Sequence, residues 1–269
     1  MTPRSASWRW PVLVGSAWIV LLFLMVPTLV SVPVSLTPNR YLSLPRNGLS
    51  LQHYTTLLGD ESWRAAIGQS LGIGVVVMLI SVALGTGAAI GLWRISSSFG
   101  EAARLLVLAP LIVPPVVSAL AFYRFFATAN LLDSFTGVII AHTVLATPYV
   151  LVAVSASLAT IDPRQEQASR SLGGSSFQTI GWVILPQAMP GVLAGSVFAF
   201  LCSWDEIVVT LFVAARTVYT LPRKMWDGIN DQVDPTIASA ATFLFLVTVL
   251  AIGLQVLRSD KEPSSSEAA

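Results

Sequence analysis

The sequence contains few charged residues: Asp, Glu, Lys and Arg make up 11% of its 269 positions. Ordinary soluble domains carry roughly 25% charged residues, and 54% of this chain is apolar. The composition therefore excludes an ordinary water-soluble protein. The formal net charge is only +1, so no bulk field favours a nucleic-acid partner, and we expect none.

Groups that carry chemistry are scarce as well. The single cysteine, Cys202, cannot form an intrachain disulfide, and the two histidines, His53 and His142, belong to no cluster at metal-ligand spacing. The nucleotide-binding pattern G-x4-G-K-[ST] is missing, so the chain does not by itself hold ATP phosphates. A membrane enzyme would need a catalytic constellation that we do not find. We therefore expect a non-enzymatic protein that binds no metal or cofactor.

The sequence is rich in long stretches without charge. Each is near or above the ~20 apolar residues that a helix needs to cross a ~30 Å hydrocarbon core. We therefore predict an all-α polytopic membrane protein with about six transmembrane helices, the first of which is too long for a cleaved signal peptide. The uncharged stretches are residues 10–39, 65–93, 105–123, 134–161, 171–204 and 235–257.

Small residues and prolines distinguish two of these stretches. Pro110, Pro114 and Pro115 predict a kinked or broken helix, because proline lacks a backbone donor and disrupts the bond to the preceding turn. Interrupted helices often line the pathway in transporters, and a purely structural kink is an equal alternative. Small-xxx-small spacing in the second stretch predicts close helix packing without specifying a partner; these residues are Gly68, Gly72, Gly87 and Gly91.

Polar residues within or beside the apolar stretches are the next candidates. We expect His53 to be solvated in a loop and His142 to be packed, neutral and hydrogen-bonded, although a histidine within a membrane also invites a functional hypothesis. Asp205 and Glu206 lie roughly 26 Å along a helix counted from Ala188. Burying a carboxylate in lipid costs at least ~2.5 kcal/mol, so these acids should face a water-filled cavity or a partner, unless they form a wet helix end.

The polar segment between residues 162 and 186 interrupts two apolar stretches. Asp162 can cap a helix and Pro163 suits its first turn. We predict a short polar helix over residues 164–172, stopped by Gly173 and Gly174, and a second helical stretch that ends at Pro186. Two short helices with small residues on one face suit insertion into a cleft of another protein.

This segment resembles the cytoplasmic motif E-A-A-x3-G-x9-I-x-L-P of the inner-membrane permeases of binding-protein-dependent ABC importers. The spacing is retained throughout, with Gln167, Ser169 and Val183 replacing the motif's Glu, second Ala and Ile. The neighbouring acid Glu166 could replace the missing Glu, although it would point in another direction on a helix. The candidate residues for coupling to an ATPase are Glu166, Gln167, Ala168, Ser169, Arg170, Gly173, Val183, Leu185 and Pro186.

Further stretches, SLQHYTTLLGDESWRAAIGQSL, PLIVPP, SWDEIVVTLFV and TLPRKMWDGI, are similar to the spermidine/putrescine-type permease subfamily. The resemblance implies the type I ABC importer permease (MetI-like) fold in a bacterial inner membrane, with both termini cytoplasmic. It implies an N-terminal tail, first transmembrane helix and periplasmic loop over residues 1–64, a five-helix core over 65–257 and a cytoplasmic tail over 258–269. The implied partners are two copies of an ATPase subunit that uses the ATP, a second permease and a periplasmic binding protein.

The sequence indicates the family more clearly than it indicates the solute. A polyamine suits the acidic pair, and similar chains serve opines, aminobutyrate and phosphonates. The competing class is an ion-coupled secondary transporter that uses the acidic pair as its coupling site, although such proteins often contain an inverted repeat that is missing here. The candidate residues of the solute pathway are Trp204, Asp205, Glu206, Pro114 and Pro115.

Overall fold

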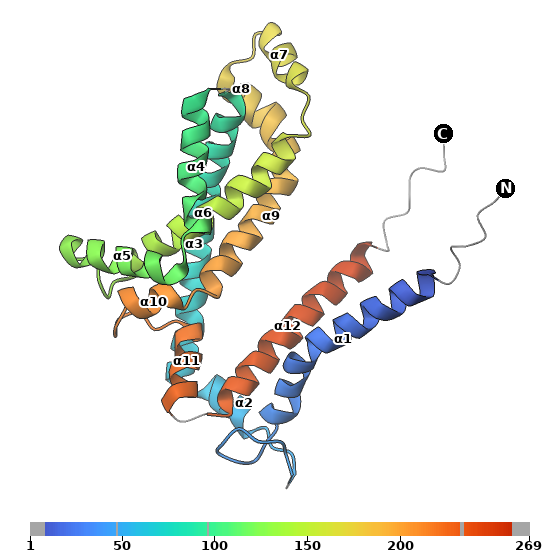
Figure 1. Ribbon diagram of the computed structural model, residues 1–269, viewed down its shortest axis with the longest axis vertical. Coiled ribbons are helices and arrows are strands. Elements are labelled where there is room, and N and C mark those ends of the chain that lie inside the picture. The colour runs from blue at the N-terminus through green and yellow to red at the C-terminus, as the bar shows by residue number, and fades with distance from the viewer. Residues whose placement is uncertain (1–8, 47, 96, 232–233, 260–269) are drawn as a thin grey trace, which may run out of the picture. The chain divides into compact units, whose positions relative to one another are not determined.

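The computed structural model describes residues 9–46, 48–95, 97–231 and 234–259, and all regular elements within these ranges are helices (Figure 1). The chain divides into two compact units, one of Ala65–Lys224 and one of Met1–Arg64 with Met225–Ala269. Two helices, α3 (Glu61–Arg94) and α11 (Leu221–Asp231), continue from one unit into the other.

The unit that contains both ends of the chain is built on α1 (Arg9–Ser35) and α12 (Thr236–Ser259), which pack against each other. Ser31 Oγ lies 3.2 Å from Thr242 Oγ1 across this pair. The short helix α2 (Gln52–Gly59) packs on α12. His53 is buried, not solvated as we expected, and its Nε2 lies 3.0 Å from the carbonyl oxygen of Asn39, which replaces water as its partner.

The larger unit is centred on α6 (Phe135–Leu158) and α9 (Leu185–Trp204), which pack along each other, with α3 and α4 (Ser98–Ile112) against them (Figure 1). The short helices α7 (Pro163–Ser171) and α8 (Ser176–Thr179) lie at one end of this bundle. α5 (Pro115–Ala129) packs on α10 (Val208–Val213) away from that end.

Close packing within this unit depends on glycines other than those that we expected. A Cβ atom at Gly191 would lie 2.6 Å from the Ala153 carbonyl oxygen, and one at Gly85 would lie 2.6 Å from Val150 Cβ. Gly195, four residues after Gly191, meets Val150 Cα at 3.0 Å. The small-xxx-small pair that joins α6 and α9 is therefore in α9. Among the described residues, no atom lies within 4 Å of a Cβ placed at any of the four expected positions, Gly68, Gly72, Gly87 and Gly91.

The prolines of the third apolar stretch break it into two helices. α4 ends at Ile112 and α5 begins at Pro115, and the two axes differ by 105°. Pro115 occupies the first turn of α5, where a missing N–H costs nothing, and the residues before Pro114 and Pro115 have an extended ψ (129° at Val113, 137° at Pro114). Pro110 lies inside α4 and does not end it. The broken helix that the prolines predicted is confirmed.

Among the described residues, up to five of the six expected crossings are long and apolar enough to span a membrane. Four described helices are long and apolar enough to cross a membrane, and the bent α4–α5 pair gives a fifth crossing when it is counted as one. The apolar part of α12, Thr236–Leu250, is shorter than these helices, so a sixth crossing there stays a prediction. α11 forms between the fifth uncharged stretch and the last one.

Candidate functional site

α7 begins and ends as its sequence predicts. The Asp162 carboxylate accepts a hydrogen bond from the backbone N–H of Arg164 at 2.9 Å, and Pro163 fills the first position. The helix ends at Ser171, and Gly173 has a φ of +86°, which an L side chain rarely adopts. Gly174 is required for a different reason, since a Cβ there would lie 2.8 Å from the Ser169 carbonyl oxygen.

The segment after α7 differs from the predicted second short helix. Ser175 and Gln178 form a capping box at the start of α8, with the Ser175 N–H donating to Gln178 Oε1 at 2.8 Å. The chain then continues through a π-helical turn, Ile180–Ile184, directly into α9. Pro186 therefore does not end a helix. It lies in the first turn of α9, where its missing N–H is tolerated.

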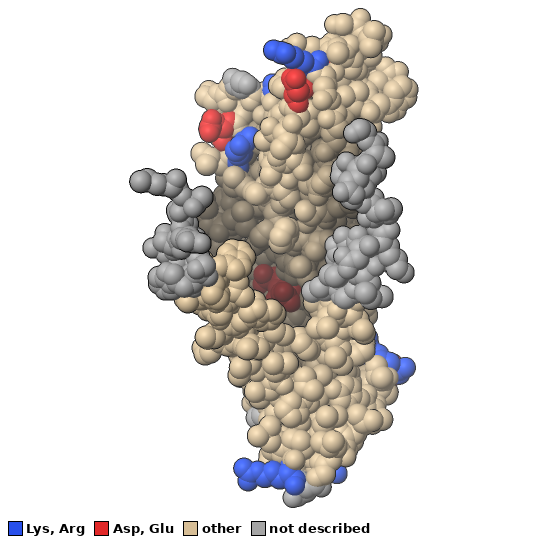
Figure 2. All heavy atoms as spheres, turned by 90° about the vertical axis from the view of Figure 1, so that its right-hand side faces the viewer, with Lys and Arg blue, Asp and Glu red and all other residues tan. Residues whose placement is uncertain are grey.

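Large apolar side chains on this segment point into solvent. Leu172 is 90% exposed, Phe177 88% and Trp182 78%. Leu172 and Trp182 line an open hollow of about 580 Å³, whose lining also includes Ala168, Ser169, Gly173 and Val183 from the predicted set. Gln167 and Pro186 are exposed outside that lining, and Leu185 is half-buried. On the face in Figure 2, charges of both signs gather near the end of the molecule that carries α7.

α7 is held to its neighbours by polar contacts from several elements. Arg94 Nη2 at the end of α3 lies 2.7 Å from Glu166 Oε1, and both side chains are partly buried. The Gln187 amide donates to Gln165 Oε1 at 2.7 Å. Ser169 and Thr179 share a hydrogen bond of 2.9 Å, and Arg170 donates to Ser176 Oγ at 3.0 Å. Glu166 therefore faces α3 within the chain.

Asp205 and Glu206 lie where α9 ends, at the start of a short non-helical connection that we call the acidic turn (residues 205–207). The Glu206 carboxylate accepts a hydrogen bond from the backbone N–H of Val209, in the first turn of α10, at 2.8 Å. The two acids border a hollow of about 350 Å³, whose other walls are Tyr149, Phe198, Leu201 and Cys202. Two carboxylates and two aromatic rings thus surround one space.

The remaining predicted pathway residues lie outside this hollow. Trp204 stacks on Phe200, with ring centroids 5.8 Å apart. Pro114 and Pro115 are exposed at the break between α4 and α5, and neither lines the hollow at the acidic turn. Their connection to the acidic turn runs through packing of α5 against α10. The aromatic wall was missed in the sequence, because Tyr149 and Phe198 look like ordinary apolar positions of a membrane helix.

A second feature missed in the sequence is the connection formed by Asp133. Its carboxylate accepts from the backbone N–H groups of Ala215, Arg216 and Thr217 at 2.8–2.9 Å, and so joins the loop before α6 to the loop after α10. Burial raises the pKa of the Asp133 carboxyl, but these bonds outweigh burial and lower the pKa to about 2. Within the described part of the chain, no three His, Cys, Asp or Glu residues gather at a possible metal site.

The chain combines a multi-span helical bundle, a polar helical loop at one end and a helix that ends in an acidic turn, and its family match makes it a membrane transport component rather than an enzyme. The chain belongs to the family described as "Binding-protein-dependent transport system inner membrane component", whose sequence pattern matches residues 81–259. It is therefore a multi-pass protein of the inner-membrane permease class.

Individual relatives agree with this family. The chain is 27% identical over 240 residues to the spermidine/putrescine transport system permease protein PotC of Escherichia coli (strain K12), covering 89% of this chain and 90% of the relative. It is 29% identical over 229 residues to the putrescine transport system permease protein PotI of the same strain, covering 82% and 81%.

A solved structure has the same fold. It is a chain of a bacterial alginate ABC transporter in complex with an alginate pentasaccharide-bound periplasmic protein. That chain matches with a TM-score of 0.72 at 15% identity, over 95% of this chain and 94% of its own length.

Proposed function

We propose that this chain forms half of the translocation pathway of an importer for a polyamine-like cation and couples that pathway to ATP hydrolysis by a separate ATPase subunit. The observation that carries the proposal is the hollow at the acidic turn, where Asp205 and Glu206 meet Tyr149 and Phe198. The names of the polyamine permeases that it resembles point to the same class of solute.

The chemistry of this hollow favours an organic cation. Two adjacent carboxylates attract ammonium groups, and the faces of aromatic rings attract cations by about 0.5–2 kcal/mol depending on desolvation. Apolar walls from Leu201 and the aromatic rings suit the methylene chain between two ammonium groups. Pro114 and Pro115 contribute by setting the break that lets α5 pack against α10, next to the acidic turn.

The coupling part of the proposal rests on α7 and the exposed apolar side chains after it. Leu172, Phe177 and Trp182 lie at the polar end of the bundle, where exposed apolar groups of this size mark a surface for a protein partner. In this assignment that partner is the ATPase, present in two copies. It uses the ATP, while this chain binds no cofactor. The α7 end and both termini are then cytoplasmic, and a second permease and a periplasmic binding protein complete the importer.

The proposal is tested by solute uptake into proteoliposomes that contain the assembled transporter. We expect uptake of putrescine or spermidine to require ATP, and Asp205→Asn to lower uptake while leaving the assembly intact. An opine, aminobutyrate and an alkylphosphonate serve as the competing solutes. Preference for one of these would contradict the polyamine assignment, and uptake by this chain alone on a proton or sodium gradient would contradict the ATP-driven mechanism.

A further inference from the structure

His142 connects both sides of the acidic turn to α6. Its side chain is fully enclosed, at 1% exposure. Its Nδ1 lies 2.9 Å from Ser203 Oγ in the last turn of α9, and its Nε2 lies 3.0 Å from Thr210 Oγ1 in α10. We propose that His142 is a positioning residue that holds the acidic turn in the place where Asp205 and Glu206 face the solute.

The hydrogen-bond directions follow from the partners of Thr210. Its hydroxyl donates to the backbone carbonyl of Glu206 at 3.1 Å, so it accepts from the Nε2–H of His142. His142 Nδ1 is then the acceptor for the Ser203 hydroxyl. One neutral imidazole thus completes a chain of bonds that runs from α9 through α6 to the backbone of the acidic turn itself.

The acidic turn depends on such side-chain bonds because it lacks a helical ladder of its own. Residues 205–207 are outside α9 and α10, and α10 has only six residues, too few to be stable without tertiary support. Without the imidazole, the hydroxyl of Ser203 would lose its partner at a buried position, and that of Thr210 would lose one of two. Leaving buried polar groups unpaired is costly, so the turn would shift to re-pair them.

The inference rests on the proposed function, because it assigns the solute contact to the acidic turn. It is tested in the assembled transporter with three substitutions that remove different bonds. His142→Leu removes both bonds, His142→Asn keeps a polar group near the position of Nδ1, and His142→Gln keeps one near Nε2. Thr143→Val is the matched control, since Thr143 is the buried neighbour whose hydroxyl has no hydrogen-bond partner among the described residues.

Two readouts separate positioning from general stability. The first is ATP-driven putrescine uptake. The second is alkylation of Cys202 by a small water-soluble maleimide, followed by mass spectrometry of this chain. Cys202 is the only cysteine of the sequence and lines the same hollow as Asp205 and Glu206, so its reactivity reports on the turn without any substitution in it.

We expect His142→Leu to lower uptake about tenfold, an effect of the size that loss of buried hydrogen bonds produces, and to change the alkylation rate of Cys202 severalfold. His142→Gln should retain more uptake than His142→Asn, because it keeps the bond to Thr210 that leads to Glu206. Thr143→Val should match the wild type in both readouts.

Wild-type uptake together with wild-type Cys202 alkylation in His142→Leu would overturn the inference. If His142→Leu does not assemble, Thr210→Val and His142→Gln decide. We then expect Thr210→Val to lower uptake and His142→Gln to retain more uptake than Thr210→Val. Wild-type uptake and wild-type Cys202 alkylation in both variants would overturn the inference. If the wild-type complex takes up no polyamine, the proposed function fails. Cys202 alkylation then still shows whether His142 positions the turn.

Discussion

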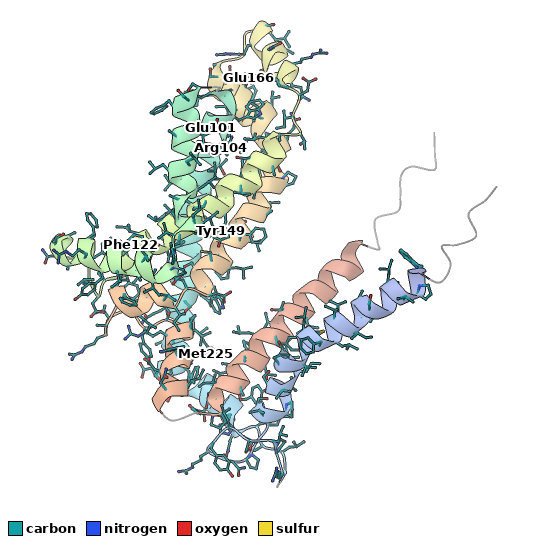
Figure 3. All side chains as sticks on the ribbon, in the orientation of Figure 1. Glu101, Arg104, Phe122, Tyr149, Glu166 and Met225 are labelled. Atoms are coloured by element: carbon teal, nitrogen blue, oxygen red, sulfur yellow. The ribbon has the colours of Figure 1, made fainter. Side chains whose placement is uncertain are left out.

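Arg94 Nη2 lies 2.7 Å from Glu166 Oε1, and this ion pair joins the last residue of α3 to the first turn of α7. The family motif carries its acid one position later, where this chain has Gln167. The acid that is present is therefore engaged within the chain. Arg94, the last residue of α3, holds α7 through this pair. Figure 3 shows Glu166 at the same end of the bundle as Glu101 and Arg104.

The ion pair predicts that the placement of α7 depends on opposite charges at these two positions. Glu166→Gln should raise the amount of ATP hydrolysed per solute imported, because a less firmly held α7 transmits ATPase closure less completely. A partly exposed pair is worth only about 1 kcal/mol, so we expect a change of severalfold rather than complete loss. Transport and ATP hydrolysis measured together in proteoliposomes give this ratio.

Two variants control this prediction. Exchange of the charges, Arg94→Glu with Glu166→Arg, should restore part of the coupling, but not all of it, because an arginine in the first turn of α7 opposes the helix dipole. Glu101→Gln removes an exposed acid from the neighbouring α4 and should leave the ratio unchanged. If the exchange is no better than the single substitutions, the ion pair does not position α7.

The turn after α7 predicts a difference between two side chains at Gly173. Its φ of +86° disfavours a β-branched residue, while the space around its Cβ position is open among the described residues. Gly173→Val should therefore lower uptake strongly, whereas Gly173→Asn, whose side chain tolerates positive φ better, should retain much more. Uptake normalised to membrane-inserted protein measures the difference, and equal uptake of the two variants would show that this backbone conformation is not required.

The contact between α6 and α9 predicts a stability loss on adding one methyl group. Gly191→Ala places a Cβ atom 2.6 Å from the Ala153 carbonyl oxygen, a backbone atom that cannot move aside alone. We expect destabilisation of about 1–3 kcal/mol, visible as a lower midpoint of thermal unfolding for the chain in detergent. Gly87→Ala is the matched substitution in open space and should leave the midpoint unchanged or slightly higher. Equal midpoints for Gly191→Ala and Gly87→Ala would show that the close contact at Gly191 does not stabilise the fold.

The Asp133 contact predicts a specific pH dependence. The pKa of this carboxyl is lowered from 3.8 to about 2 in the folded chain, so the charged form stabilises the fold at every pH above the unfolded value. That stabilisation is lost as the pH falls from about 4 to about 2. Asp133→Asn should therefore unfold at a lower temperature than the wild type at pH 6, and the two midpoints should converge toward pH 2. A constant difference across this range would mean that the charge of Asp133 is not responsible.

Most of the architecture could be predicted from the pattern of charge and proline. The uncharged stretches locate the apolar helices, and Pro114 with Pro115 locates the break between α4 and α5. The caps of α7 could be read from Asp162 and Gly173, because capping is a local property of the backbone. These features depend on neighbours in the sequence.

Features that depend on distant neighbours could not be predicted in this way. Three helices, α4, α5 and α6, lie between Arg94 and Glu166 in the chain. Gly191 packs against α6, whereas Gly87 lies in open space among the described residues, and nothing in their local sequence distinguishes them. The continuous passage from α8 into α9 was also missed, since Pro186 normally signals a helix end and the π-helical turn before it leaves no sequence mark. Likewise, His53 was wrongly placed in solvent, because its partner, the Asn39 carbonyl oxygen, lies 14 residues earlier, in the loop before α2.

We propose that the surface beside α7 binds the ATPase and that the acidic turn contacts the solute. This proposal is tested most directly by measuring how much ATPase copurifies with this chain, together with ATP-driven putrescine uptake, for Leu172→Asp with Phe177→Asp and for Asp205→Asn. Both apolar residues are almost fully exposed, so their substitution should not disturb the bundle. We expect the double variant to lose ATPase and uptake together, and Asp205→Asn to keep the ATPase but lose uptake. Full ATPase retention and full uptake in the Leu172→Asp, Phe177→Asp variant would contradict this proposal.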